Sequence, residues 1–388
     1  MNILIYTRFY PSETSGGVEH VTFILREQFS SLGQNITILY KQGDAVDEDI
    51  NAIQLPIHNE SDFISSLCKE RNISKVIIQG DIEVVSLFEN LKNECEIFYV
   101  HHGDPGYGYT TTLLSTYLFY LRFGNWRVKI SCILRIILFP LIKTTKYFSL
   151  RKMYKSLPTY VNKVVLISSR SINSFMHYSG IKRNDFVTYV NNPLSYEICS
   201  DEHIRNKEKV VLVVCRMEEF TKKTSLALNV WKKVMKNKEY TDWTLKIVGD
   251  GKDLSLYKSM VKSQNISNVV FCGYDNPFPY YKSASIFMMT SVSEGWGMTL
   301  TESMQNGCVP IAFDSYPAVR DIVSHGENGF LVEPMNLDTY SKCLMRLMNN
   351  EAERICMSIK AEDFVQKFSK EKIAQKWVEL LSQYVPLS

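Results

Sequence analysis

Short apolar runs alternate with longer stretches of helical spacing along most of this chain. In the first half, the runs typical of buried strands lie at 2–6, 36–40, 75–79, 96–100 and 163–167. In the second half they lie at 210–215, 244–248, 269–272, 286–290 and 309–313. This alternation predicts an α/β fold built on doubly wound, mainly parallel sheets. A length of 388 residues suggests two such domains.

The seam between the two predicted domains lies near Asn191-Asn192-Pro193-Leu194 and the polar, charged stretch 200–209. We therefore expect an N-terminal domain over 1–195 and a C-terminal domain over 196–367. The last segment, 368–388, begins with a helical pattern over Phe368–Trp377.

Composition is ordinary for a globular enzyme, with 45% hydrophobic and 22% charged residues. Nine cysteines are scattered singly, which suits buried thiols in a reducing compartment. The first residues, Met1–Tyr6, begin a strand and lack the basic and apolar regions of a signal peptide, so we expect a cytoplasmic protein. The one Asp-x-Asp, at Asp47-Glu48-Asp49, lies in a polar stretch that predicts an exposed loop, and no metal site is expected.

Charge is concentrated in one segment, residues 111–155, which carries nine basic and no acidic side chains. Removing these nine from the 44 basic residues leaves 35 basic against 41 acidic ones, so this segment alone makes the chain basic. It is also rich in apolar residues. The nine basic residues are Arg122, Arg127, Lys129, Arg135, Lys143, Lys146, Arg151, Lys152 and Lys155.

This basic and apolar segment predicts a helix lying on an anionic membrane surface. Its apolar run 130–142 is broken by Arg135 and Pro140, and is too short to span a bilayer. The alternative is a helical excursion packed on the N-terminal domain, with its basic face in water. Nucleic acid binding is a weaker alternative, because no recognition motif accompanies the charge.

The stretch from Ser291 to Glu302 combines two carboxylates, Glu294 and Glu302, with two glycines, Gly295 and Gly297. It stands between an apolar strand and a short helical segment. Glycines let backbone N–H groups approach a ligand at a helix N-terminus, where the dipole favours an anion such as a diphosphate. Ionised carboxylates accept hydrogen bonds from sugar hydroxyls. This combination indicates a site for a sugar joined to a phosphate.

Ser-Glu-Gly-Trp-Gly-Met-Thr-Leu-Thr-Glu, followed by Gly-Cys-Val-Pro-Ile, resembles the Glu-x7-Glu motif of the retaining family 4 glycosyltransferases. The resemblance covers most of the chain and is strongest over 210–335. It implies the GT-B fold, in which two Rossmann-like doubly wound domains face each other across a cleft and a C-terminal helix crosses back to the N-terminal domain. It also implies that Glu294 contacts the donor sugar, that Glu302 holds the ribose, and that the residues around them line the donor. Those neighbours are Gly295, Trp296, Gly297, Met298 and Thr299.

Further candidates follow the predicted strands of the second half, where ligands of open α/β sheets bind. Arg216 ends one strand, with Lys222 and Lys223 after it; the resemblance implies that Arg216 and one of the two lysines hold the donor diphosphate. Fixed cations stabilise the charge that grows on a departing phosphate. The turns Gly249-Asp250-Gly251 and Gly273-Tyr274 match positions where the family binds its donor, the second of them at the nucleobase.

Two candidates lie in the first half. Gly16-Gly17 follows the first strand and resembles the family's glycine loop over the donor phosphates. His101-His102 ends another strand, and relatives place a histidine there near the reactive sugar carbon. We favour His102, with His101 pointing into the core.

The resemblance implies a retaining, metal-independent glycosyltransferase that moves a sugar from a nucleotide diphosphate donor to a hydroxyl. The expected donor is a UDP-sugar, with no cofactor. The expected acceptor is a lipid-linked or growing oligosaccharide of a bacterial surface polysaccharide, at the inner face of the membrane. Nucleic acid is not an expected partner.

Two alternatives remain at this level. One is another enzyme of the same fold, a sugar-nucleotide epimerase or a phosphorylase. The other is a non-catalytic, membrane-attached protein that binds a sugar nucleotide.

Overall fold

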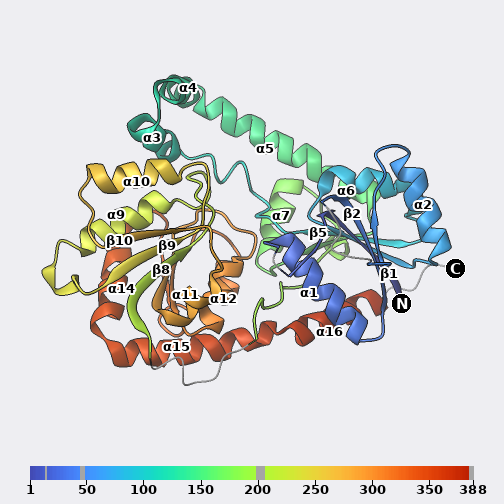
Figure 1. Ribbon diagram of the computed structural model, residues 1–388. Coiled ribbons are helices and arrows are strands. Elements are labelled where there is room, and N and C mark those ends of the chain that lie inside the picture. Colours follow the sequence, from blue (N-terminus) through green and yellow to red (C-terminus); the bar gives the residue numbers. More distant parts are fainter. Residues whose placement is uncertain (14, 44–48, 198–205, 384–388) are drawn as a thin grey trace. The chain divides into compact units, whose positions relative to one another are not determined.

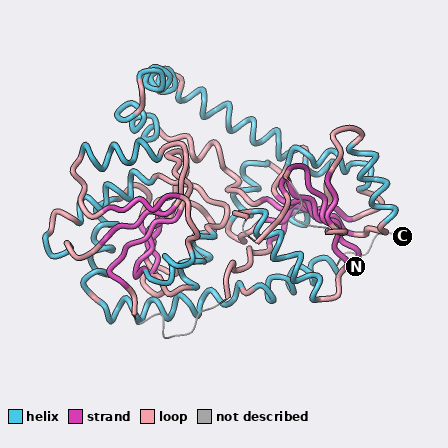
Figure 2. The backbone as a smooth tube through the Cα atoms, in the orientation of Figure 1, coloured by secondary structure: helices cyan, strands magenta, loops and turns pink. Residues whose placement is uncertain are grey.

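The computed structural model describes residues 1–13, 15–43, 49–197 and 206–383. The chain forms two compact units, each built on its own parallel sheet (Figures 1 and 2). The first unit contains Met1–Pro105, Ser149–Ser195 and Lys367–Ser388. The second contains Gly106–Phe148 and Tyr196–Gln366.

The first unit has a seven-stranded sheet in the order β3-β2-β1-β4-β5-β6-β7, and every neighbouring pair is parallel. Its strands are β1 (Asn2–Phe9), β2 (Asn35–Gln42), β3 (Ala52–Gln54), β4 (Lys75–Gln79), β5 (Glu96–His101), β6 (Lys163–Leu166) and β7 (Val187–Tyr189). Its helices are α1 (Val18–Ser31), α2 (Glu60–Glu70), η1 (Ile82–Leu91), α6 (Leu157–Tyr160), α7 (Ser171–Ser179), η2 (Asn184–Phe186) and α16 (Lys370–Ser382).

The second unit has a six-stranded parallel sheet in the order β10-β9-β8-β11-β12-β13. Its strands are β8 (Glu208–Val214), β9 (Thr244–Val248), β10 (Val269–Gly273), β11 (Ala284–Met289), β12 (Val309–Phe313) and β13 (Phe330–Val332). Its later helices are α9 (Thr224–Val234), η3 (Lys238–Tyr240), α10 (Leu254–Ser263), α11 (Phe278–Ser283), α12 (Met298–Gln305), α13 (Val319–Ile322), α14 (Leu337–Asn349) and α15 (Glu351–Val365), with η4 (Gln366–Phe368) at the unit boundary.

The predicted α/β fold is confirmed, and a strand is present at each of the ten expected positions. Three strands were missed, β3, β7 and β13, and each has three residues. All three lie at an edge of their sheet. An edge strand pairs on one side only, and three residues are too few for a hydrophobic period to show in the sequence.

The basic and apolar segment departs from its expected place, because residues 106–148 lie in the second unit and not in the first. This segment forms α3 (Leu114–Phe123), α4 (Trp126–Ile137) and the first part of α5 (Phe139–Lys155). Tyr117, Phe119, Tyr120 and Cys132 are buried in the same hydrophobic cluster as the strands of the second sheet. Burial of these side chains ties the segment to the second unit. The unit boundary falls inside α5.

The last helix, α16, lies in the first unit and packs against α1. Ile373, Ala374, Trp377 and Leu381 form its buried face, at the spacing of an amphipathic helix. None of the helices that the structure describes combines the length and the hydrophobicity needed to span a lipid bilayer.

The ends of β8 and β9 approach each other closely, and two glycines permit this. The Cys215 N–H donates to the Val248 carbonyl at 3.1 Å, and the Met217 N–H donates to the Asp250 carbonyl at 2.8 Å. A Cβ at Gly249, where φ is +127°, would lie 2.0 Å from the Cys215 carbonyl oxygen. At Gly251 a Cβ would lie 2.6 Å from the Met217 carbonyl oxygen. The turn after β9 therefore requires glycine at both positions.

We predict that Gly249→Ala destabilises the protein far more than Gly273→Ala. The first change adds a backbone clash to an unfavourable φ and should cost more than about 3 kcal/mol. Gly273 has φ of +78° with no atom within 4 Å of its Cβ position, so its change carries the backbone strain alone, about 1 kcal/mol. The urea midpoints of the two variants measure the difference, and equal midpoints would contradict the close approach of β8 and β9.

Candidate functional site

The carboxyl ends of the second sheet gather the expected motifs at one edge. The chain runs outward from β8 through β9 to β10 in one direction and from β11 through β12 to β13 in the other. Neighbouring β8 and β11 therefore form the switch point of this sheet, where open α/β sheets bind ligands. The loop after β8 carries Arg216 and Lys222, and the loop after β11 carries Glu294.

Lys222 and Glu294 form an ion pair across this switch point. Lys222 Nζ lies 2.6 Å from Glu294 Oε1, and 22% and 14% of the two side chains are exposed. Burial by itself would lower the pKa of Lys222, but the Glu294 carboxylate outweighs it and raises that pKa. Lys222 is therefore a fixed cation at neutral pH, held beside a carboxylate at the end of two central strands.

Hydrogen bonds to backbone carbonyls hold the two loops together. Thr290 Oγ1 donates to the carbonyls of Lys222, at 3.2 Å, and Lys223, at 3.1 Å. The Val292 N–H donates to the Thr221 carbonyl at 2.8 Å. Ser315 Oγ, in the loop after β12, donates to the Ser291 carbonyl at 2.7 Å. The positions of Lys222 and Glu294 are thus set by main-chain contacts between three adjacent strand ends.

The glycine loop leads directly into α12. Gly297 occupies the N-cap position with φ of 97°, and a Cβ there would lie 2.7 Å from the Tyr316 hydroxyl. Gly295, Met298 and Thr299 are half-buried beside it. The macrodipole of a helix makes its N-terminus positive, so this end of α12 favours an anion. Trp296 departs from the expected lining role, because its side chain is packed inward and only 2% of it is exposed.

Glu302 lies in the second turn of α12 and is nearly buried, with 9% exposed. Its Oε2 accepts a hydrogen bond from the hydroxyl of Tyr281, in α11, at 2.9 Å. Burial, and then the Glu302 carboxylate, raise the pKa of Tyr281 well above its usual value, so the phenol remains a donor. The sequence offered no signal for Tyr281, because it precedes Glu302 by 21 residues and shares no pattern with the motif.

The structure distinguishes the two consecutive lysines. Lys222 turns toward Glu294, whereas Lys223 is fully buried and lies 3.8 Å from Glu219 Oε1. Lys222 is therefore the lysine at the switch point. Arg216 is more open: 71% of its side chain is exposed, and its Nη2 lies 3.1 Å from Glu218 Oε2.

The turn after β10 is also at this edge of the sheet. Gly273 accepts a hydrogen bond at its carbonyl from the Gly249 N–H at 2.7 Å, so the two predicted turns are neighbours. Tyr274 follows with 86% of its surface exposed. Its ring lies in solvent in this structure, and the expected contact with a nucleobase stays a prediction.

The first unit brings its own candidates together at the carboxyl ends of β1, β4 and β5. Gly16 and Gly17 are exposed, and Gly17 has φ of 63° at the N-cap of α1. A Cβ at Gly80, after β4, would lie 3.6 Å from both the His102 ring and the Val18 side chain. His102, the glycine loop and the turn after β4 are therefore neighbours.

His102 is a neutral imidazole. Its Nε2–H donates a hydrogen bond to Gln79 Oε1, with 2.5 Å between the nitrogen and the oxygen, and Nδ1 of the neutral ring is then an acceptor. Burial, and then neighbouring His101, lower the pKa of His102 to about 3. Gln79 was missed, although a polar residue and a glycine directly after an apolar strand are the signal that could have found it.

His101 points into the first unit, as the sequence predicted. The Tyr99 hydroxyl lies 3.3 Å from its Nδ1, and the Tyr154 hydroxyl lies 3.3 Å from its Nε2. Its ring packs edge to face on Tyr154, with centroids 5.4 Å apart. Burial lowers the pKa of His101 to about 4.

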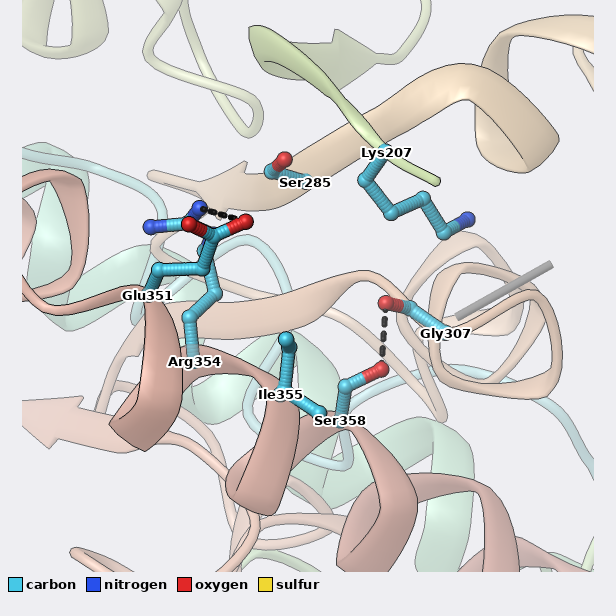
Figure 3. A pocket seen from close by; sticks show the side chains of 7 residues that line it. All are labelled: Lys207, Ser285, Gly307, Glu351, Arg354, Ile355 and Ser358. Atoms are coloured by element: carbon cyan, nitrogen blue, oxygen red, sulfur yellow. Dashed lines mark hydrogen bonds and ion pairs between the residues drawn. The ribbon is translucent and has the colours of Figure 1, made fainter. Parts of the chain in front are cut away.

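The small pocket in Figure 3 lies at the opposite edge of the second sheet. Lys207, Ser285 and Gly307 come from the amino ends of β8, β11 and β12, and α15 closes the other side. Ser358 Oγ donates to the Gly307 carbonyl at 2.6 Å, and Arg354 pairs with Glu351 at 3.9 Å. Its space of about 10 Å³ holds roughly one water, so it is a packing defect and not a substrate site.

No group of three or more potential metal ligands occurs among the residues that the structure describes. Asp47 and Glu48 of the Asp-x-Asp lie outside the described residues. Asp49 pairs with Arg26, and the Tyr10 hydroxyl donates to Asp49 at 3.1 Å.

Comparison with known sequences finds one family model and several relatives that match part of the chain. Residues 197–365 match the family model of glycosyl transferases group 1. An uncharacterized glycosyltransferase of Haemophilus influenzae is 36% identical over 156 residues, which are 40% of this chain and 44% of the relative. The poly(glycerol-phosphate) alpha-glucosyltransferase of Bacillus subtilis is 25% identical over 229 residues, which are 58% of this chain and 33% of the relative. The chain therefore matches less than half the length of either relative.

Two solved structures resemble the whole chain. TarM, from S. aureus, gives a TM-score of 0.75 at 13% identity and covers 98% of both chains. HepE of Anabaena, determined in complex with UDP, gives a TM-score of 0.72 at 14% identity, over 99% of this chain and 100% of HepE. At these identities the likeness shows the fold. Its two parallel sheets give this chain the GT-B fold, and residues 197–365 of its second unit match the family model of glycosyl transferases group 1.

Proposed function

We propose that this protein is a retaining glycosyltransferase that transfers a sugar from a nucleoside diphosphate sugar, a UDP-sugar, to a hydroxyl of a glycan or lipid-linked acceptor. The observation that carries the proposal is the Lys222–Glu294 pair at the switch point of the second sheet. It sets a cation and a carboxylate side by side, and the loop that carries the carboxylate leads into the N-terminus of α12. A diphosphate is bound by the cation and by the helix N-terminus, and a sugar hydroxyl donates a hydrogen bond to the carboxylate.

A diphosphate suits the positively charged groups at the carboxyl ends of the second sheet. Lys222, Arg216 and the N-terminus of α12 together offer positive charge where the sugar–phosphate bond would break. Charge on the departing phosphate grows in the transition state, so fixed donors there lower the barrier. These groups supply the electrostatic stabilisation of the leaving group from the protein itself.

The roles of the two carboxylates differ with their surroundings. We assign Glu294, half-buried beside Lys222, to the donor sugar. We assign Glu302 to the ribose, because its carboxylate is held in α12 by Tyr281. Tyr281 limits the rotation of Glu302 and so reduces the entropy lost when a ribose hydroxyl binds.

The transfer itself needs no protein base in this proposal. The anomeric carbon–oxygen bond to the phosphate breaks, the acceptor hydroxyl oxygen bonds to the same face of that carbon, and the acceptor proton passes to the departing phosphate. In the first unit, we assign His102 to the donor sugar and the Gly16-Gly17 loop to the donor phosphates. The neutral His102 orients hydroxyls and does not serve as the base.

The acceptor side of the proposal includes an anionic membrane surface, because α4 is apolar on two faces. Val128, Cys132 and Ile136 pack on the second unit. The opposite side chains, spaced as one helical stripe, are exposed: Trp126, Ile130, Ile133, Leu134 and Ile137.

Leu141 and Phe148 extend the exposed apolar surface along α5. Exposed Arg127, Arg135 and Lys146 accompany it, and no acidic residue occurs between Asp104 and Asp185. Apolar side chains in a cationic frame suit an anionic leaflet, which would bring the enzyme to a lipid-linked acceptor. The B. subtilis relative is named a poly(glycerol-phosphate) alpha-glucosyltransferase, and this name supports a polymeric acceptor.

We predict that Lys222→Met lowers turnover of UDP-glucose by about 100-fold or more, because the departing diphosphate loses a fixed cation. Release of UDP without acceptor and transfer to an acceptor both report the loss. Lys233→Met is the matched control, since Lys233 forms an ion pair with Asp338 at 2.6 Å on the surface of the same unit. Equal turnover of the two variants would contradict the assignment, and failure of the wild type to bind UDP in calorimetry would contradict the function.

We predict that His102 does not shape the pH dependence of the reaction. With a pKa lowered to about 3, it stays neutral from pH 5 to 8. His102→Gln should reduce turnover by about 10-fold through one lost hydrogen bond, while the profile of kcat/KM against pH keeps its form. Exposed His177→Gln is the control. A limb near pH 6.5 that disappears only in His102→Gln would show a titrating His102.

We predict that the protein floats with liposomes containing phosphatidylglycerol and that its affinity falls in high salt. Each basic residue near the leaflet contributes about 1 kcal/mol, so neutralising three should weaken binding by about 100-fold. The charge variant changes Arg127, Arg135 and Lys146 to Gln.

The control for the flotation changes three exposed lysines elsewhere in the second unit, Lys236, Lys238 and Lys262, to Gln. A third variant replaces Trp126, Ile133 and Ile137 by Ser and should lose the part of binding that resists salt. Equal flotation with neutral and anionic vesicles, or equal losses in the charge variant and its control, would contradict the membrane surface.

A further inference from the structure

The loop between β8 and α9 sends its side chains in two directions. Lys222 points toward Glu294, and the next residue, Lys223, points into the interior of the second unit. Lys223 has φ of 52° and ψ of 42°, the left-handed conformation, at the N-cap of α9. A non-glycine residue holds this conformation only when its surroundings impose it. What fixes Lys223 therefore also fixes the direction of Lys222.

A buried ion pair holds Lys223. The exposed fractions are 0% for Lys223 and 1% for Glu219. The Glu219 carboxylate also accepts hydrogen bonds from Ser225 Oγ at 2.6 Å and from the Tyr257 hydroxyl at 3.0 Å. Burial lowers the pKa of Lys223 and raises that of Glu219, each opposed by the charge of the other. Such a pair depends on every hydrogen bond that completes it.

One of those hydrogen bonds comes from α3. Lys223 Nζ donates to Thr116 Oγ1, and Thr116 is fully buried. One turn later in the same helix, the Tyr120 hydroxyl donates to Asp253 Oδ2 at 2.7 Å. That carboxylate oxygen also accepts the Glu219 N–H at 2.9 Å. Thr116 thus contacts the side chain of Lys223, at the end of the loop. Tyr120 contacts Asp253, which holds the backbone of the loop at Glu219.

The rings on α3 pack against the same loop. Tyr117 and Tyr120 lie 6.2 Å and 5.8 Å from Phe220, measured between ring centroids. Phe119 lies 5.7 Å from Tyr257, the residue that donates to Glu219. The side of the loop that faces away from Glu294 is therefore lined by α3 and by the helix α10.

We propose that α3 is a positioning element of the donor site and that Thr116 and Tyr120 are its positioning residues. Through Lys223 and Asp253 they hold the loop in the conformation that directs Lys222 to Glu294. The inference rests on the proposed function and adds to it a role for a helix about 100 residues away in the sequence.

The same helix leads into α4, so the residues proposed to enter the membrane and those that hold the donor loop belong to one continuous segment. Gly124 and Asn125 alone separate α3 from α4. The Gly124 N–H donates to the Tyr120 carbonyl at 2.8 Å, which makes this connection tight.

The test compares Thr116→Val and Tyr120→Phe, which remove the two hydroxyl groups and keep the side-chain volume. Each should lower kcat for release of UDP from UDP-glucose by about 10-fold to 100-fold, because small displacements of a reacting group have such effects. KM for the acceptor should not change. Thr116→Ser restores the hydroxyl and should restore kcat.

Tyr117→Phe is the matched control, because the described part of the structure shows no hydrogen bond to the Tyr117 hydroxyl while its ring packs in the same cluster. It should keep wild-type kcat. Melting temperatures, measured for all four variants, set the assay temperature well below every transition.

The outcomes separate the inference from the function. Wild-type kcat in both Thr116→Val and Tyr120→Phe would overturn the positioning role while leaving the glycosyltransferase in place. A loss in Thr116→Val that Thr116→Ser fails to restore would overturn it as well. A wild-type protein that neither binds UDP nor releases it from UDP-glucose would overturn the proposed function itself.

Discussion

Two consecutive lysines, one at the ligand edge and one in the core, connect the chemistry of this protein to its fold. Lys223 is buried against Glu219, and its backbone is in the left-handed conformation. The turn sends Lys222 outward to Glu294. Leaving either member of a buried ion pair without its partner typically costs about 3–5 kcal/mol, so the core resists any other arrangement of the loop. The position of the outer charge is thus stabilised by the inner one.

Contacts within the protein also fix the loops at the neighbouring strand ends. Thr290, Val292 and Ser315 use main-chain contacts to hold the loop that carries Glu294. Gly249 and Gly297 let backbone and ring atoms come closer than a Cβ would allow. Groups held by contacts to the backbone are already in position before a ligand binds. Such preorganisation lowers the entropy lost on binding.

The segment between β5 and β6 is shared between the two units. It leaves the first unit after Pro105, packs its aromatic residues into the core of the second, and returns within α5. Its helix α4 buries one apolar face and exposes another. A helix with two apolar faces and a cationic frame satisfies two environments at once, a protein core and a leaflet. In the proposed function, this one element combines a structural role with the binding of a surface.

Sequence reasoning and tertiary structure decided different things about this protein. Each longer strand, the glycine loop before α12 and the positions of Arg216, Lys222, Glu294 and His102 after strand ends could be predicted, because hydrophobic period and turn chemistry are local properties of the chain. The edge strands β3, β7 and β13 could not, since three residues carry no period.

Only the tertiary structure decided which lysine faces Glu294, that Trp296 turns inward, that Tyr281 holds Glu302, and that residues 106–148 join the second unit. In each case the deciding partner lies far away in the sequence. Lys223 needs Thr116 and Glu219 to be buried, and α3 needs Phe220 and Tyr257 to pack on. The type of a side chain, apolar or charged, predicts that it needs a packing or ion-pair partner. Which residue becomes that partner depends on how the fold brings distant segments together.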